Sequence, residues 1–298
     1  MDTAIIKQFS ELKSKKKASE FYSKALKIIT AALEDLSHEI TVITPENTRV
    51  FPIGEFSSDT FIDEVGEIEV VIATSEPQII LANKVFSKNL KETKKQKEKN
   101  SISTKGTSHE VVFALFKKLI PFFNETTTLL INDSGIKILC NREFDFKIMI
   151  RFGTYEQNDD DYKINIWNPI TKSESLVDIF GYHEAIDNKD KETNGNYKKV
   201  VRILKNARKN ILMNKLAQSN EINKYLVELI AYNIPNKLLI GDDINTILTK
   251  SMLYLSNCNV NKMQDFQGKN IKSFSLAKVN TSNIKSFLNY SNNLIFYN

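Results

Sequence analysis

Cysteine, histidine and long apolar runs are scarce in this chain of 298 residues. Its two cysteines, Cys140 and Cys258, are too few for a disulfide framework, and together with three scattered histidines they lack the spacing of a zinc site. No apolar stretch approaches the length of a transmembrane helix, and the first residues lack the charged-then-apolar pattern of a signal peptide. We therefore expect a cytoplasmic protein that does not engage a membrane.

The overall composition is that of a soluble globular protein. Hydrophobic residues make up 41% of the chain and charged residues 26%. The length allows one large domain or two ordinary ones, each with its own core. The net charge of +5 is a mild basic excess, which suits a polyphosphate ligand and is compatible with nucleic acid without requiring it.

A glycine turn followed by two acids is the most informative feature of the sequence. Gly54 begins a segment rich in hydroxyl side chains, residues 54–60, and Glu67 and Glu69 stand at the head of an apolar run. Two acids one residue apart on a strand share a face, because side chains alternate along a strand, and that face can hold a divalent metal. A glycine turn lets backbone amides approach a phosphate. The segment therefore predicts a metal and a nucleoside triphosphate brought together.

Hydrophobic periodicity predicts a mixed α/β first half. Helical spacing of apolar residues indicates helices, and short apolar runs bounded by turn residues indicate strands. The predicted elements are a long helix at 5–36, strands at 50–53, 68–73, 128–131, 136–140 and 144–152, a helix at 78–86, a solvated charge run at 91–99, and a helix that starts at a capping box, 107–110.

The character of the sequence changes after about residue 155. One further strand is predicted at 163–167, and the rest is predicted to be mainly helical, with helices at 196–212, 221–232 and 243–255. The fold class is therefore α/β followed by α, with a mixed sheet and a long N-terminal helix in a first domain, 1–155, and helices in a second, 156–298.

One face of the helix predicted at 196–212 is basic. Lys198, Arg202, Lys205 and Lys209 recur at i, i+4, i+7 and i+11, which places them on one side of the helix. Such a stripe can neutralise a triphosphate, although a charge pattern of this kind is more often a solvated helix face.

In their order and spacing, Gly54, Thr60, Glu67 and Glu69 resemble the signature glycine, threonine and paired acids of the DNA polymerase β-like nucleotidyltransferase superfamily. The threonine lies six positions after the glycine and the first acid thirteen. Residues 197–208 and 225–235 are similar to the helical half of its bacterial cGAS/DncV-like and oligoadenylate synthetase branch. The resemblance extends over roughly residues 45 to 260.

The resemblance implies a nucleotidyltransferase core in residues 1–155, an oligoadenylate synthetase-like helical domain in 156–298, and a cleft between them. It also implies that Glu67, Glu69 and Asp145 hold two Mg²⁺ ions, or Mn²⁺, and that Asp145 helps to deprotonate the attacking hydroxyl. The nucleotide-binding residues that it implies are Gly54, Ser57, Ser58, Thr60, Arg202 and Lys205, of which Lys205 matches the family lysine that reaches the phosphates.

The implied activity is the template-independent joining of nucleoside triphosphates into a cyclic or short linear oligonucleotide second messenger, with a role in anti-phage defence. One alternative is nucleotide addition to RNA or to a protein, but the sequence shows neither a strongly basic groove nor an RNA-recognition module.

Departures from the family pattern favour another alternative. Glu55 stands where the family has a serine, so that Ser57 or Ser58 has to take over its contact, and glutamate replaces aspartate at both Glu67 and Glu69. The longer side chains matter because Mg²⁺ demands nearly ideal octahedral geometry. This hypothesis is a catalytically degenerate protein that binds a nucleotide or a partner.

Overall fold

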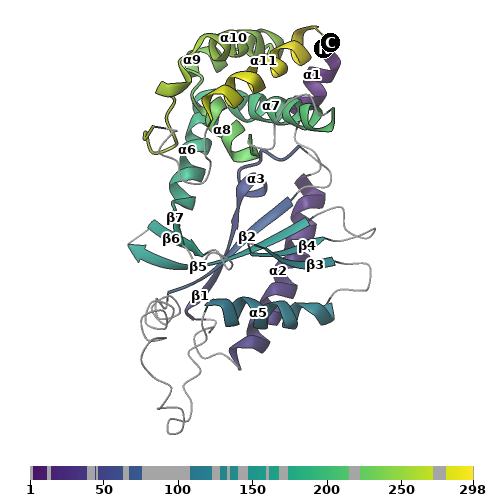
Figure 1. The fold of residues 1–298 in the computed structure, drawn as a ribbon, viewed down its shortest axis with the longest axis vertical. Helices are drawn as coiled ribbons and strands as arrows, with labels where there is room; N and C mark the ends of the chain where they lie inside the picture. The colour runs from purple at the N-terminus through teal and green to yellow at the C-terminus, as the bar shows by residue number, and fades with distance from the viewer. Residues whose placement is uncertain are drawn as a thin grey trace. The chain divides into compact units, whose positions relative to one another are not determined.

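A computed structural model describes residues 3–11, 15–38, 44, 46–62, 67–75, 108–122, 128–132, 135–139, 147–158, 161–167, 174–214, 222–270 and 280–297. The chain forms two compact units (Figure 1). The helical unit contains Met1–Lys13, Ser57–Asp63 and Gly181–Asn298, and the sheet unit contains Ser14–Phe56 and Glu64–Phe180. None of the helices in the described part of the chain is both long and apolar enough to cross a membrane.

Within the described residues, the sheet unit is built on one mixed sheet of seven strands. Its strands are β1 (Thr48–Ile53), β2 (Glu67–Thr74), β3 (Thr128–Asn132), β4 (Gly135–Leu139), β5 (Lys147–Asn158), β6 (Asp161–Trp167) and β7 (Glu174–Val177). Two helices, α2 (Lys15–Ser37) and α5 (Ser108–Leu119), pack against each other, and α5 also contacts β4. The short α3 (Gly54–Ser57) follows β1 directly, and the 3-10 turn η1 (Ile120–Phe122) follows α5.

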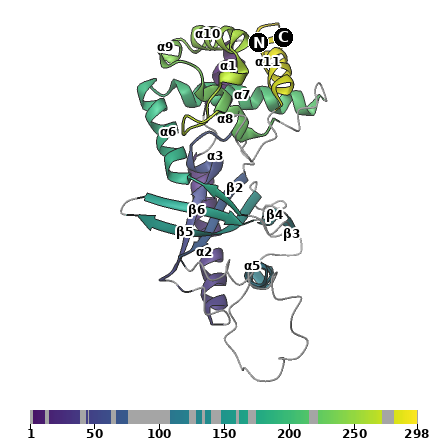
Figure 2. The ribbon, with the colours of Figure 1, turned by 60° about the vertical axis from the view of Figure 1, so that its left-hand side comes forward.

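Strand β5 pairs with different strands along its length. β2 and β5 are parallel, whereas every other neighbouring pair is antiparallel. The first residues of β5, 147–150, pair with β4, and residues 152–158 pair with β6 (Figure 2). The strand order is therefore β1-β2-β5-β4-β3. β6 pairs with the later residues of β5, and β7 pairs with β6.

The predicted domain boundary near residue 155 lies inside β5, so the chain does not divide there. Because β6 pairs with β5 and β7 pairs with β6, the sheet unit continues to Phe180. The sequence prediction did not include β7, which is only four residues long, or the extension of β5 to Asn158.

The prediction of one long helix over residues 5–36 is wrong. Helix α1 (Thr3–Ser10) ends and α2 begins at Lys15, and the two belong to different units. The reason is that Ile6 of α1 is buried in the core of the helical unit, where α1 packs against α7 and α10. The Arg202 side chain also donates to the carbonyl of Ser10, 2.6 Å away, and so satisfies the last residue of α1.

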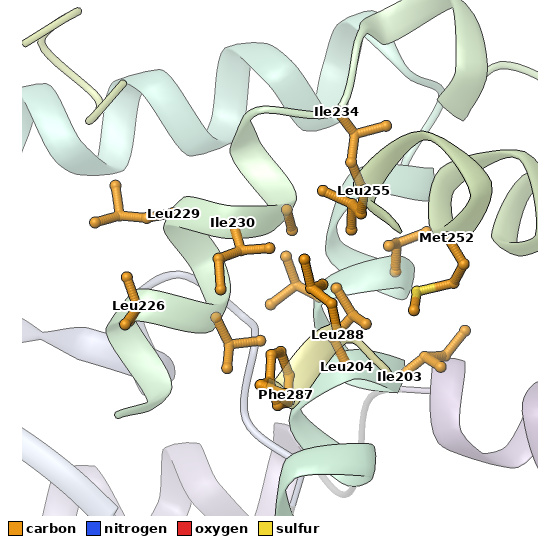
Figure 3. Close-up of a cluster of buried hydrophobic side chains, with 14 of the residues drawn as sticks. Ile203, Leu204, Leu226, Leu229, Ile230, Ile234, Met252, Leu255, Phe287 and Leu288 are labelled. Carbon is orange, nitrogen blue, oxygen red and sulfur yellow. The ribbon is translucent and has the colours of Figure 1, made fainter. Parts of the chain in front are cut away.

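The helical unit adds six helices and a 3-10 turn to α1. They are α6 (Ile179–Glu192), α7 (Asn196–Met213), α8 (Lys224–Tyr232), α9 (Asn236–Leu239), α10 (Ile244–Asn257), η3 (Val260–Lys262) and α11 (Thr281–Tyr297). α7 contacts α1, α8 and α11. The apolar faces of α7, α8, α10 and α11 meet in one core, part of which is shown in Figure 3.

The helix predictions for this half are confirmed in α7, α8 and α10. The starts of α8 and α10 are set by capping side chains: Asn223 accepts from the backbone of Leu226, and Asp243 accepts from Asn245 and Thr246. The hairpin of β3 and β4 is also confirmed. The predictions at 78–86 and 91–99 lie outside the described residues, as does the start of the capping box, and so does Asp145.

Candidate active site

The glycine turn and the acidic strand lie side by side in the sheet unit. The antiparallel register of β1 and β2 pairs Ile53 with Glu69, which brings Gly54 to the Glu69 side chain. Gly54 has a φ of +70°, and a Cβ at this position would lie 3.4 Å from Oε1 of Glu69. The structure therefore brings together the two features that the sequence analysis connected. The left-handed backbone favours glycine here, whereas a Cβ at 3.4 Å would make only an ordinary contact with the carboxylate.

Arg151 shares a face of the sheet with Glu69. Glu67 pairs with Lys147 and Val71 pairs with Arg151, so positions 67, 69, 147 and 151 share one face of the parallel pair. Arg151 donates from Nε and Nη2 to the same oxygen, Oε2 of Glu69, at 3.1 and 3.0 Å. A guanidinium therefore partly neutralises the Glu69 carboxylate.

The chemistry of Glu69 suits a metal ion, because Mg²⁺ and Mn²⁺ prefer carboxylate oxygens. Glu67 occupies a strand position on the same face, and Asp145 lies outside the described residues. Within the part of the chain that the structure describes, no three His, Cys, Asp or Glu side chains gather as a metal site would require. The three-carboxylate metal site therefore stays a prediction.

The three predicted hydroxyl residues differ in exposure. Ser58 and Thr60 are buried, with 1% and 0% of their surface exposed, and their hydroxyl oxygens are 2.8 Å apart. Ser57, at the end of α3, is half-buried. Of these three residues, Ser57 is the one that is not fully buried.

Thr60 and Lys205 belong to a buried network in the helical unit. The Lys205 ammonium donates to the carbonyl and hydroxyl oxygens of Thr60, at 3.3 and 2.9 Å, and to Oε1 of Glu228, at 2.5 Å. The Thr60 hydroxyl donates to the same Glu228 oxygen. Three contacts match the three hydrogens of an ammonium group. As a phosphate ligand, Lys205 would have to exchange some of these contacts, so that role stays a prediction.

Glu228 is the centre of this network. Its side chain is 2% exposed, and Tyr182 of α6 donates to its second oxygen, Oε2. Burial raises the pKa of Tyr182 well above 10.0, and the Glu228 charge adds to this effect, so the phenol stays protonated as a donor. One carboxylate thus connects α6, α7 and the 57–63 segment to α8.

The other members of the basic stripe are also engaged. Arg202 is buried and donates to the carbonyls of Ser10 and Asp59, at 2.6 and 2.9 Å. Lys198 forms an ion pair with Asp187 at 2.7 Å. Two of the four stripe residues, Arg202 and Lys205, are therefore part of the interior of the helical unit, while Lys209 is exposed.

His183, for which the sequence suggests no role, contacts a predicted nucleotide-binding residue. Its Nε2 lies 2.7 Å from the Ser57 hydroxyl oxygen. Burial lowers the pKa of His183 below 6.5, which Lys198 reinforces and Asp187 and Glu228 oppose. The ring is therefore neutral at pH 7.

Two further side chains are buried. Glu55, which replaces the family serine, is 8% exposed, and Trp167 is a core residue of the sheet unit at 3%. The sequence analysis missed Glu228, although an acid within the apolar run 226–231 is a signal that a buried cation lies nearby. No comparable signal identified Arg151 or His183.

Comparison with known proteins identifies one family model and several solved structures that match the chain. Residues 184–295 match the family model of the cGAS/DncV-like nucleotidyltransferase C-terminal helical domain. No protein with curated annotation matches the sequence.

Several solved structures share the fold over the whole chain. The CdnE cyclic dinucleotide synthase of Elizabethkingia meningoseptica, solved with GTP and Apcpp, is 15% identical with a TM-score of 0.71, and the match covers 100% of both chains. The CdnE c-UMP-AMP synthase of Rhodothermus marinus is 16% identical, with a TM-score of 0.68 over 99% of this chain and 96% of that one. CdnC of E. coli MS115-1, solved with ATP, is 14% identical, with a TM-score of 0.62 over 99% and 90%. The predicted fold class and the resemblance to this branch are confirmed.

Proposed function

We propose that this chain joins nucleoside triphosphates into a cyclic or short linear oligonucleotide. Support comes from residues 184–295, which match the model of the cGAS/DncV-like nucleotidyltransferase C-terminal helical domain, and from the fold shared with a cyclic dinucleotide synthase. The observation that carries the proposal is the contact of Gly54 with Glu69, because it sets a glycine turn against an acidic strand within this fold. The solved relatives that share the fold include synthases of cyclic dinucleotides. A second messenger role in anti-phage defence remains part of the proposal.

The proposed site uses this chain's residues in three ways. Glu67, Glu69 and Asp145 would hold two Mg²⁺ or Mn²⁺ ions, which supply Lewis-acid stabilisation of the reacting phosphate. Gly54 allows the left-handed turn that lies beside the Glu69 carboxylate. Ser57 presents a half-buried hydroxyl to the triphosphate, while Ser58, Thr60, Arg202 and Lys205 hold the shape of the segment that carries it.

The test is turnover of labelled nucleoside triphosphates with Mg²⁺ or Mn²⁺, with pyrophosphate release as the readout and mass spectrometry of the product. The wild type is compared with a Glu67→Ala/Glu69→Ala double variant and with Glu34→Gln, an exposed acid of α2 that serves as a matched control. We expect the double variant to lose activity and the control to keep it. Turnover that survives in the double variant contradicts the assignment of the acids. A labelled RNA or protein product would favour nucleotide addition instead.

One observation favours the degenerate alternative. Arg151 already places a positive charge on the Glu69 oxygen Oε2, where a catalytic carboxylate would bind metal. If Arg151 competes with the metal, Arg151→Gln raises the affinity for Mn²⁺ measured by electron paramagnetic resonance. If Arg151 instead orients Glu69, the same variant lowers both metal affinity and turnover. A wild type that binds nucleotides and releases no pyrophosphate with either metal and any acceptor supports the degenerate protein.

A further inference from the structure

The Ser57–His183 pair combines a half-buried hydroxyl with a titratable ring. Both residues belong to the helical unit, Ser57 in the 57–63 segment and His183 in the first turns of α6. The distance of 2.7 Å between Oγ and Nε2 is that of a good hydrogen bond. The ring also packs against Tyr182, with 5.2 Å between centroids, and the Tyr182 hydroxyl is fixed on Glu228. The position of the His183 ring is therefore defined by packing as well as by this hydrogen bond.

The direction of the hydrogen bond decides what Ser57 can offer a ligand. If Nε2 carries the ring proton, it donates to the Ser57 oxygen, and the hydroxyl hydrogen can be donated elsewhere. If Nδ1 carries the proton, Nε2 accepts the hydroxyl hydrogen, and Ser57 presents only lone pairs. A phosphate oxygen is an acceptor, so it is attracted in the first case and repelled in the second.

We infer that His183 is a positioning residue for phosphate binding: by donating from Nε2 to Ser57, it directs the Ser57 hydroxyl hydrogen at a phosphate oxygen of the nucleotide. This inference rests on the proposed function, because Ser57 is assigned there to the triphosphate. Its neighbours Ser58 and Thr60 are buried and bonded to each other, so they leave this contact to Ser57.

The inference makes nucleotide binding depend on the protonation of His183. The doubly protonated ring always carries a hydrogen on Nε2 and adds a positive charge next to the phosphate. A bound phosphate therefore favours the protonated ring and raises the pKa of His183. The charged groups that act on the ring are Asp187 on α6, Lys198 on α7 and Glu228 on α8, and Lys198 and Asp187 are paired with each other at 2.7 Å.

Histidine NMR tests this directly, because the chain has three histidines and the signal lost in a His183 variant identifies the residue. The signal is titrated with and without the non-hydrolysable α,β-methylene analogues of ATP and GTP. We expect the pKa of His183 to lie below about 6.5 in the unbound protein and to rise when an analogue binds. The signals of His38 and His109 serve as internal references.

Two substitutions separate the hydrogen bond from the shape of the ring. His183→Phe keeps a ring against Tyr182 but removes Nε2, and we expect it to weaken analogue binding by about twofold to tenfold. His183→Gln keeps an N–H group near the position of Nε2, so we expect affinity close to that of the wild type, without the pH dependence that titration of His183 gives to binding. His38→Gln, at the exposed end of α2, is the matched control.

The outcomes distinguish the inference from the proposed function. If calorimetry shows that neither analogue binds the wild type, both the proposed function and the inference are wrong. If an analogue binds but leaves the pKa of His183 unchanged, and His183→Phe binds it as the wild type does, the inference alone is overturned. A raised pKa together with weakened binding by His183→Phe and rescue by His183→Gln supports it.

Discussion

Replacing Glu228 by glutamine removes a negative charge from the interior of the helical unit and preserves the shape of the side chain. In the wild type, one carboxylate oxygen accepts from Lys205 and Thr60 and the other accepts from Tyr182. A glutamine presents an amide N–H₂ in place of one oxygen, so one of these donors would face another donor. The Lys205 ammonium, whose side chain is 0% exposed, would lose its counter-ion.

The expected cost follows from this burial. Removing one partner of a buried ion pair costs about 3–5 kcal/mol, because the remaining charge is left uncompensated in a low dielectric. At about 3 °C per kcal/mol for a unit of this size, Glu228→Gln should lower the melting temperature by roughly 9–15 °C. Circular dichroism at 222 nm follows the helices. Fluorescence of the single tryptophan, Trp167 in β6, follows the sheet unit separately.

The matched control is Asp187→Asn, which removes the more exposed partner of the Lys198 ion pair. Its carboxylate is 63% exposed, so we expect a loss of less than about 1 kcal/mol. A Glu228→Gln melting temperature within about 2 °C of the control would refute the reasoning, because the network would then not stabilise the unit. A Glu228→Gln/Lys205→Met double variant should lose less than the sum of the two single losses, because it leaves no buried charge unpaired.

Three further predictions concern single positions. Gly135→Ala should lower the free energy of urea unfolding of the sheet unit by more than about 4 kcal/mol, because its Cβ would lie 2.0 Å from the carbonyl oxygen of Ile150. Gly195→Ala has no heavy atom within 4 Å of its Cβ, so it should cost only about 1–2 kcal/mol of left-handed strain. Equal losses would contradict the register of β4 and β5. Gly54→Ala should lower pyrophosphate release, because alanine disfavours the left-handed backbone, φ +70°, of the turn beside Glu69; unchanged turnover would contradict the role of this turn. Burial lowers the pKa of Lys189 from 10.5 to about 8, so the unfolded chain binds more protons than the folded chain between these pH values. The free energy of unfolding should therefore rise from pH 8 to about pH 9.5. Urea titrations should show this rise in the wild type and not in Lys189→Met.

Much of the fold could be predicted because its signals are local. The helices α7, α8 and α10 follow from apolar residues at helical spacing and from capping residues next to them in the sequence. The division of the first 37 residues into α1 and α2 could not be predicted in this way. Both segments are amphipathic, and the separation depends on Ile6 joining the core of the helical unit.

For the candidate site too, some features could be predicted from local sequence signals and others could not. The sequence identified Gly54 and Glu69, because their spacing matches a signature, and the antiparallel register of β1 and β2 brings them together. It placed Lys205 in a basic stripe and, from the family resemblance, predicted that this lysine reaches the phosphates. In the structure this lysine is buried on Glu228 and Thr60, which are 23 and 145 positions away in the chain.

The sequence by itself determined the fold class, helices α7, α8 and α10, the family resemblance and the residue types that can bind metal and phosphate, because these depend on composition, periodicity and spacing. The tertiary structure decided which charges are compensated. Whether a carboxylate meets a metal or an arginine, and whether a histidine lies on a serine, depends on strand register and helix packing between segments far apart in the chain. Arg151 on Glu69 and His183 on Ser57 are contacts of this kind.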